Sequence, residues 1–68
     1  MTIGQRIKIA RIAKKYTQRE LASKLDVCTM FISELERDIR KPSVSTVIKL
    51  SDALNVSTDY LLKGTIAN

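Results

Sequence analysis

Apolar residues recur at spacings of three and four along most of this chain, which is the period of an amphipathic α-helix. Nowhere do apolar and polar residues alternate with period two, so we expect no β-strand. Residues that favour helix ends divide the pattern into five predicted helices, which begin near Ile3, Gln18, Thr29, Val44 and Thr58. The predicted fold class is therefore all-α.

The starts of these helices carry residues that cap helix N-termini, which are Thr2, Thr17, Ser43 and Ser57. Gln5 and Glu20 stand three residues after the first two and complete two capping boxes. The far ends carry basic residues that suit the helix dipole or residues that tolerate a left-handed backbone, namely Lys14, Lys15, Asp26, Asn55 and Gly64. Four of the five predicted helices thus have local signals at both ends.

The segment from Gln18 to Arg37 contains two short helices joined by a tight turn. Its apolar residues fall on the facing sides of the two helices and in the turn, and they are Leu21, Ala22, Leu25, Val27, Ile32 and Leu35. The other face of the second helix is predicted to point outward, with Thr29, Met30, Ser33, Glu34 and Arg37. Many proteins use a helix pair of this kind to place one rigid helix in the major groove of DNA.

Charge is distributed unevenly along the 68 residues, which are enough for one domain. Residues 1–41 hold ten basic and five acidic side chains, a balance of +5, whereas residues 42–68 hold two of each and balance to zero. All of the excess positive charge therefore accompanies the helix pair, as a phosphate-binding surface requires. The alternative is a solvated basic face without a partner.

Several classes of protein are not indicated by the composition. The chain has one cysteine, Cys28, and no histidine, so neither an internal disulfide nor a metal site is expected. No nucleophile stands at a recognisable spacing from a base, and no glycine-rich phosphate loop occurs, so we expect no enzyme, no cofactor and no small-molecule substrate. Cys28 is either a redox-sensitive thiol at the start of a helix or a serine-sized substitute without a sensing role.

A membrane role is a weaker alternative. No run approaches the roughly 20 apolar residues that a membrane span needs. Residues 1–19 contain no acidic side chain, so the first helix resembles a targeting presequence or a helix on an anionic membrane surface. Against this interpretation, the segment leads directly into a second capped helix without a spacer.

Four segments in the same order and spacing resemble the Xre-type helix-turn-helix family of phage repressors and Cro proteins. They read IGQRIKIAR, TQRELASKLDV, ISELERDIRKPS and LSDALNVSTDYLLKG and cover residues 3–64. The resemblance implies a compact five-helix, lambda-repressor-like bundle that binds operator DNA as a dimer. Residues 1–68 are then a single helix-turn-helix domain with its core at residues 17–37.

This chain departs from the family pattern in several places. Lys15, Asp26 and Asp38 stand where the family usually has glycine, and each costs up to about 1 kcal/mol if its backbone is left-handed. Cys28 replaces the usual Ser or Thr cap of the third helix. The base-reading positions lack the Gln, Asn or Arg that are common in relatives, so the operator sequence is not predicted.

The resemblance assigns two sets of DNA contacts. Base contacts fall to the outward face of the third helix, at Thr29, Met30, Ser33 and Glu34. A methionine can pack on a thymine methyl and a glutamate can accept a hydrogen bond from cytosine, unless Glu34 only pairs with Arg37. Phe31 either extends this contact or is partly buried. Phosphate contacts are expected from Gln18, Arg19, Arg11, Arg37, Arg40 and Lys41.

In relatives, the residues that match Arg11 and Glu36 form an ion pair between the first and third helices. We expect the same pair here, where it would fix the third helix and present Arg11 toward a phosphate. Removing one partner of a partly buried pair costs several kcal/mol, against about 1 kcal/mol or less for an exposed pair.

The function expected from the sequence is sequence-specific binding of double-stranded DNA by a transcriptional regulator, as a repressor or Cro-like protein in the cytoplasm of a bacterial or phage-infected cell. A homodimer would recognise two half-sites one helical turn apart, and its surface is expected near Val44, Val56 and Leu62. The alternative is a protein-binding module, such as an antitoxin-like or anti-repressor-like partner, that keeps the fold without strong DNA affinity.

Overall fold

The computed structural model describes residues 1–64, and these form five helices with no strand among them. The helices are α1 (Ile3–Ala13), α2 (Gln18–Leu25), α3 (Thr29–Glu36), α4 (Val44–Leu54) and α5 (Thr58–Lys63). The predicted all-α five-helix bundle is therefore confirmed, and α1, α2, α4 and α5 begin directly after their predicted capping residues. Residues 65–68, which the sequence assigns to the same domain, lie outside the described residues.

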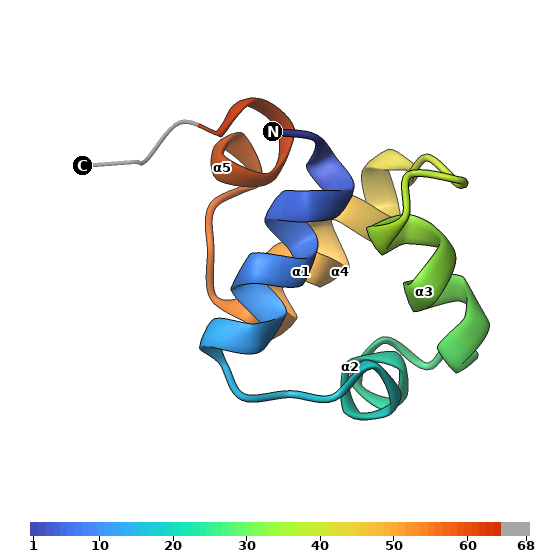
Figure 1. Ribbon diagram of the computed structural model, residues 1–68. Coiled ribbons are helices and arrows are strands. Elements are labelled where there is room, and N and C mark those ends of the chain that lie inside the picture. Colours follow the sequence, from blue (N-terminus) through green and yellow to red (C-terminus); the bar gives the residue numbers. More distant parts are fainter. Residues whose placement is uncertain (65–68) are drawn as a thin grey trace.

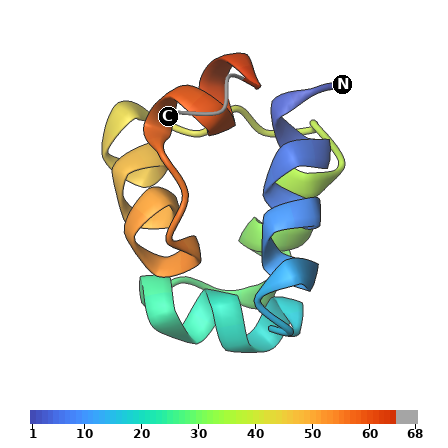
Figure 2. The same cartoon turned by 90° about the vertical axis from the view of Figure 1, so that its left-hand side faces the viewer.

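The helices are arranged around a common core. Figure 1 shows α1 at the centre in front of α4, α2 below them, and α3 and α5 at opposite edges of the molecule. Figure 2 shows α1, α2, α4 and α5 following one another around the molecule, with α3 behind α1. Helix α1 contacts α3, α4 and α5, and α2 contacts α3 and α4. This arrangement holds α3 against α1 and α2 and leaves its far side at the surface.

The core contains the apolar residues that the spacing predicts. Its fully buried side chains come from all five helices, and they are Ile7, Leu21, Ile32, Leu35, Leu50, Leu54 and Leu61. Ile9 and Ile12, which lie beside the predicted stripe of α1, remain exposed. Because α2 and α3 close on each other through Leu21, Ile32 and Leu35, the predicted seam of the helix pair is confirmed.

Both predicted capping boxes are present. The Thr2 hydroxyl accepts a hydrogen bond from the Gln5 backbone at 3.2 Å while the Gln5 side chain accepts one from the Thr2 backbone at 2.9 Å, and Thr17 and Glu20 form the same pair of bonds. Ser43 and Ser57 cap α4 and α5. Cys28 is the N-cap residue of α3 and its side chain makes no capping hydrogen bond.

Four residues other than glycine have a left-handed backbone, and they are Lys15, Asp26, Asp38 and Asn55. Asp26 and Asn55 are the C-caps of α2 and α4. The left-handed backbone predicted for Asp26 is confirmed, and the condition under which Lys15 and Asp38 cost stability is met as well. At Asp38 a side-chain role offsets part of the cost, because its carboxylate accepts hydrogen bonds from the Gly4 backbone at 2.9 Å and from the Thr2 hydroxyl.

Two residues that the sequence pattern does not single out set the positions of α1 and α5. A Cβ atom at Gly4 would lie 2.5 Å from the Leu35 carbonyl oxygen, so only glycine lets α1 approach the end of α3 this closely. Arg6 is buried and donates to the carbonyl oxygens of Leu61, Leu62 and Met1. Its positive charge thus lies at the last turn of α5, where the helix dipole favours a cation.

Candidate nucleic-acid interface

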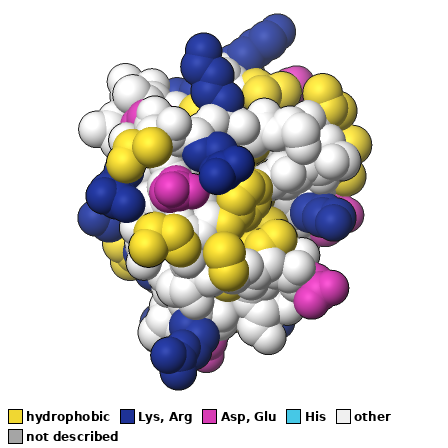
Figure 3. All heavy atoms as spheres, turned by 90° about the vertical axis from the view of Figure 1, so that its right-hand side faces the viewer, with side chains coloured by type: hydrophobic (Ala, Val, Ile, Leu, Met, Phe, Trp, Pro, Cys, Tyr) yellow, Lys and Arg dark blue, Asp and Glu magenta, His cyan; other side chains and the backbone are white. Residues whose placement is uncertain are grey.

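The outward face of α3 lies at the surface of the folded chain. Met30 is 61% exposed, Thr29 and Arg37 are exposed, and Ser33 and Glu34 are half-buried at the side of the helix. Figure 3 views the molecule from the side on which α3 lies in Figure 1, and it shows Lys and Arg side chains around much of this face with hydrophobic side chains between them. This mixture suits a surface that contacts both phosphates and base edges.

The position of α3 is fixed by a hydrogen-bond network centred on the Glu36 carboxylate. Arg11 Nε lies 2.6 Å from Glu36 Oε2 and Arg11 Nη2 lies 3.2 Å from Oε1, with the two side chains 11% and 2% exposed. Gln18 Nε2 also donates to Oε1, at 3.1 Å. A carboxylate of α3 is therefore held by side chains from both α1 and α2, so the ion pair expected between Arg11 and Glu36 is present.

The same network uses N–H donors of Arg11 and Gln18 that would otherwise be available to a ligand. Arg11 Nη1 donates to the Tyr16 carbonyl at 2.8 Å, so each nitrogen of its guanidinium already has a protein partner. Gln18 Nε2 keeps one hydrogen, and the backbone N–H groups of Gln18 and Arg19 lie in the first turn of α2, where helical N–H groups lack intrahelical partners. The start of α2 thus keeps donors that suit an anion.

Glu34 pairs with Arg40 and not with Arg37, so the pairing considered within one turn of the helix is wrong. Arg40 Nε lies 3.1 Å from Glu34 Oε1, whereas Arg37 Nε donates to the Ser33 carbonyl at 3.4 Å. The loop after α3 folds back over the helix end and brings Arg40 to the carboxylate. Phe31 is partly buried against the core, and the Arg40 guanidinium lies 5.2 Å from the centre of its ring.

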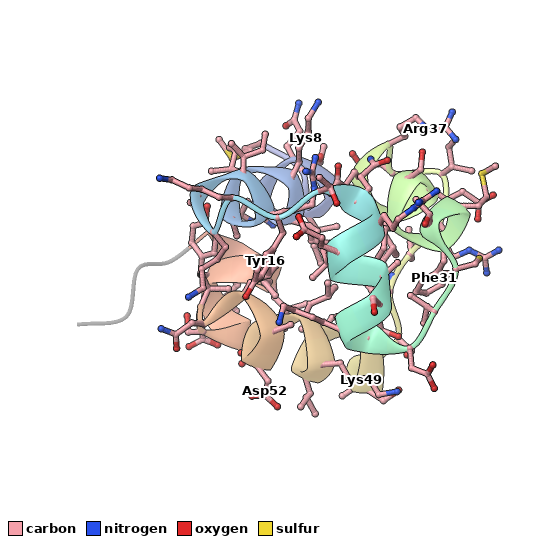
Figure 4. All side chains as sticks on the ribbon, turned by 90° about the horizontal axis from the view of Figure 1, so that it is seen from below. Lys8, Tyr16, Phe31, Arg37, Lys49 and Asp52 are labelled. Atoms are coloured by element: carbon pink, nitrogen blue, oxygen red, sulfur yellow. The ribbon has the colours of Figure 1, made fainter. Side chains whose placement is uncertain are left out.

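The remaining predicted cations differ in position. Arg19, Arg37 and Lys41 are exposed. In Figure 4, Arg37 points away from the body of the protein, whereas Lys49 and Asp52 lie on α4 at the opposite side of the molecule. A shallow hollow lies on that other side, lined by Lys14, Tyr16, Lys24, Lys49, Asp52, Ala53 and Asn55. Lys14 therefore lies on a different surface from Arg37.

An apolar hollow of about 280 Å³ lies between the start of α4 and α5. It is lined by Pro42, Val44, Val47, Ile48, Thr58 and Leu62, none of which is charged. Val44 and Leu62, both expected in a self-association surface, are exposed here. Val56, the third residue expected there, is partly buried against the core and does not line the hollow.

Two further observations concern residues 1–64. No helix among them is long and apolar enough to cross a membrane. These residues also contain no group of three or more Cys, Asp or Glu side chains placed to hold a metal ion. Cys28 is a free, exposed thiol.

A family model described as helix-turn-helix matches residues 7–61. The chain belongs to this family. It is 50% identical over 62 residues to the HTH-type transcriptional regulator ImmR of Bacillus subtilis, a match that covers 91% of this chain and 49% of ImmR. It is 37% identical over 62 residues to the immunity repressor protein of Bacillus phage phi105, covering 91% of this chain and 43% of the repressor. The chain thus spans about half the length of these relatives.

The fold of this helix-turn-helix chain is similar to that of solved repressor structures. The c2 repressor of Salmonella phage P22, solved in complex with the synthetic operator 9T, matches with a TM-score of 0.90 and 37% identity. The match covers 96% of this chain and 98% of that chain. The lambda-repressor-like arrangement of the five helices is confirmed by this likeness.

Proposed function

We propose that this chain is the sequence-specific, double-stranded DNA-binding domain of a transcriptional repressor. The observation that carries the proposal is an exposed, mixed polar and apolar face of α3, a helix that α1 and α2 hold in place through hydrogen bonds to Glu36. A preorganised helix loses little conformational freedom on entering the major groove. The likeness to a repressor structure that contains operator DNA supports the same function.

Base recognition is proposed for Thr29, Met30, Ser33 and Glu34. Met30 is 61% exposed and would contact a thymine methyl group. Glu34 would accept a hydrogen bond from the exocyclic amine of cytosine. Thr29 and Ser33 can donate to or accept from several bases, so they would discriminate less.

Phosphate contacts are proposed for two regions on either side of α3. One is the start of α2, with the amide of Gln18 and the side chain of Arg19. The other is the end of α3 and the following loop, with Arg37 and Lys41. Arg11 would contribute mainly by fixing Glu36, because three of its five guanidinium N–H groups donate within the protein and its side chain is only 11% exposed. Arg40 was expected to contact a phosphate, but its guanidinium is paired with Glu34, a member of the proposed base-contacting set.

The DNA-bound form is proposed to be a homodimer on a two-fold symmetric operator. The apolar hollow that contains Val44 and Leu62 is the proposed contact surface, because two copies can meet there without bringing charged lining residues together. We place this function in the cytoplasm of a bacterial or phage-infected cell, with no catalytic activity and no cofactor. The curated relatives are named as transcriptional regulators or repressors, which agrees with that assignment.

The experiment that tests the function is selection of bound sequences from a random duplex pool, followed by binding measurements at several salt concentrations. We expect a two-fold symmetric motif and a steep loss of affinity with salt, because each phosphate contact contributes about −0.9 to the slope of log K against log salt. Replacing Lys41 should weaken all duplexes about equally, while replacing Met30 should change the preferred sequence. If no duplex is enriched, the protein-binding alternative replaces this proposal.

A further inference from the structure

Arg40 is held against α3 by its backbone as well as by its side chain. The backbone N–H groups of Ile39 and Arg40 both donate to the Glu34 carbonyl oxygen, at 3.0 and 3.3 Å. Arg40 Nε donates to Glu34 Oε1 at 3.1 Å, and the guanidinium lies over the ring of Phe31. The loop after α3 is therefore folded so that one cation is fixed beside one carboxylate of the outward face.

The pairing of Arg40 with Glu34 reduces the repulsion that a carboxylate on the proposed DNA-contacting face would have from phosphates. Glu34 is the acidic member of the proposed base-contacting set, and an unpaired carboxylate there would be repelled by DNA phosphates. Arg40 places a positive charge against it and occupies one of its two oxygens, Oε1. The other oxygen, Oε2, makes no hydrogen bond to any of residues 1–64. A carboxylate oxygen with spare lone pairs is the acceptor that the amine of cytosine requires in the major groove.

We propose that Arg40 is a positioning residue for base recognition, which neutralises and orients Glu34 so that this carboxylate reads a cytosine. The proposal rests on the DNA-binding function proposed above. The planar guanidinium lies over the half-buried Phe31 ring, a cation–π contact that the point charge of a lysine ammonium cannot combine with the same hydrogen bond to Glu34. A simple phosphate contact would differ, because it adds the same affinity to every duplex.

The test compares the wild-type chain with Glu34→Ala, Arg40→Ala, Arg40→Lys and the double variant Glu34→Ala, Arg40→Ala. Lys41→Ala is the matched control, because it removes the neighbouring exposed cation of the same loop. Each protein is used in selection from a random duplex pool. Binding constants are then measured on the wild-type motif and on duplexes carrying each other base at the position that Glu34→Ala relaxes.

We expect Glu34→Ala and Arg40→Ala to relax the same base pair, each lowering the preference for cytosine by about tenfold or more. The double variant should relax it no further than either single variant, because both changes remove one recognition unit. Arg40→Lys should also relax it, and this variant keeps the test valid if Arg40→Ala lowers the thermal midpoint. Lys41→Ala should weaken all four duplexes by one common factor.

Two results would overturn the inference while leaving the DNA-binding function intact. One is an Arg40→Ala chain that keeps the wild-type preference and weakens all duplexes as Lys41→Ala does, which would make Arg40 a phosphate contact. The other is a wild-type motif in which Glu34→Ala relaxes no position, since no reading carboxylate would then exist. Failure of the wild-type chain to enrich any motif would overturn the DNA-binding function itself.

Discussion

Lys15 and Asp38 have nearly the same left-handed backbone, with φ of 63° and 61°, but their side chains differ in what they do. Lys15 follows the C-cap of α1 and its side chain is exposed. Asp38 follows α3 and accepts hydrogen bonds from Gly4 and Thr2 at the start of α1. An acidic side chain there satisfies a free N–H group and complements the positive end of the helix dipole. Of these two residues, only Asp38 offsets the cost of its left-handed backbone with side-chain hydrogen bonds.

Glycine substitutions should separate these two cases. Lys15→Gly should raise the free energy of unfolding by up to about 1 kcal/mol, because glycine adopts positive φ without a steric penalty. Asp38→Gly should instead lower it by roughly 1 kcal/mol, since the lost cap outweighs the relieved strain. Urea unfolding followed by circular dichroism measures both, and an Asp38→Gly chain as stable as Lys15→Gly would show that the Asp38 carboxylate contributes nothing.

At the scale of helices, α1 is the element to which α3 and α5 are both anchored. Gly4 brings its first turn against the end of α3, and Arg6 joins the next turn to the end of α5. Arg11 then holds Glu36 one and a half turns further along. Successive turns of α1 therefore set the positions of α3 and α5. Because α3 is held from its inner side, its outward face stays at the surface.

Gly4→Ala should reverse the usual effect of alanine in a helix. Alanine normally stabilises an exposed helix interior by about 1 kcal/mol relative to glycine. Here the new Cβ would lie 2.5 Å from the Leu35 carbonyl oxygen and 2.8 Å from that of Glu36, so α1 and α3 must separate. We expect a loss of about 1–3 kcal/mol, the usual cost of overpacking.

The matched control for this change is Lys8→Ala, at an exposed position of the same helix. It should leave the unfolding midpoint almost unchanged, because lysine and alanine have similar helix propensities. Thermal and urea melts of both variants give the comparison. A Gly4→Ala chain more stable than the wild type would mean that the close approach of α1 and α3 is not required.

At the scale of the whole molecule, the size of the folded chain agrees with the two-fold symmetric DNA complex proposed above. Its longest dimension is 32 Å, close to the roughly 34 Å between successive major grooves on one side of the duplex. Two copies on adjacent grooves, each with its long axis along the duplex, would therefore lie near enough to touch. None of the residues that line the hollow beside α5 is charged, so the proposed contact between copies brings no charged lining residues together.

Leu62→Gln should weaken binding to a complete operator without changing binding to an isolated half-site. Leu62 lines the proposed contact between copies, so removing its apolar side chain should lower the cooperativity of full-site binding by about tenfold, the loss of roughly 1.4 kcal/mol. Ile12→Gln is a matched control, because Ile12 and Leu62 are 55% and 53% exposed but Ile12 does not line the hollow. Equal effects of both variants on gel-shift titrations would contradict this contact surface.

The sequence by itself determined the helices, their caps and the buried seam, because these depend on residues within four positions of each other or on a simple period. Thr17 with Glu20, and the leucines and isoleucines of α2 and α3, are such cases. The resemblance to a family added the pair of Arg11 and Glu36. The identities of the proposed DNA-contacting residues rest on that resemblance too, and only binding experiments test them.

Tertiary structure alone decided the contacts between residues far apart in the chain. Arg6 and Leu61 are separated by 55 positions and Gly4 and Asp38 by 34, and no local pattern encodes such partners. The pairing of Glu34 with Arg40 was missed for a related reason, since Arg37 is the nearer cation on a regular helix but the loop after α3 turns back on it. Helix positions are set by periodic burial, whereas the charges between helices pair according to where the folded backbone places them.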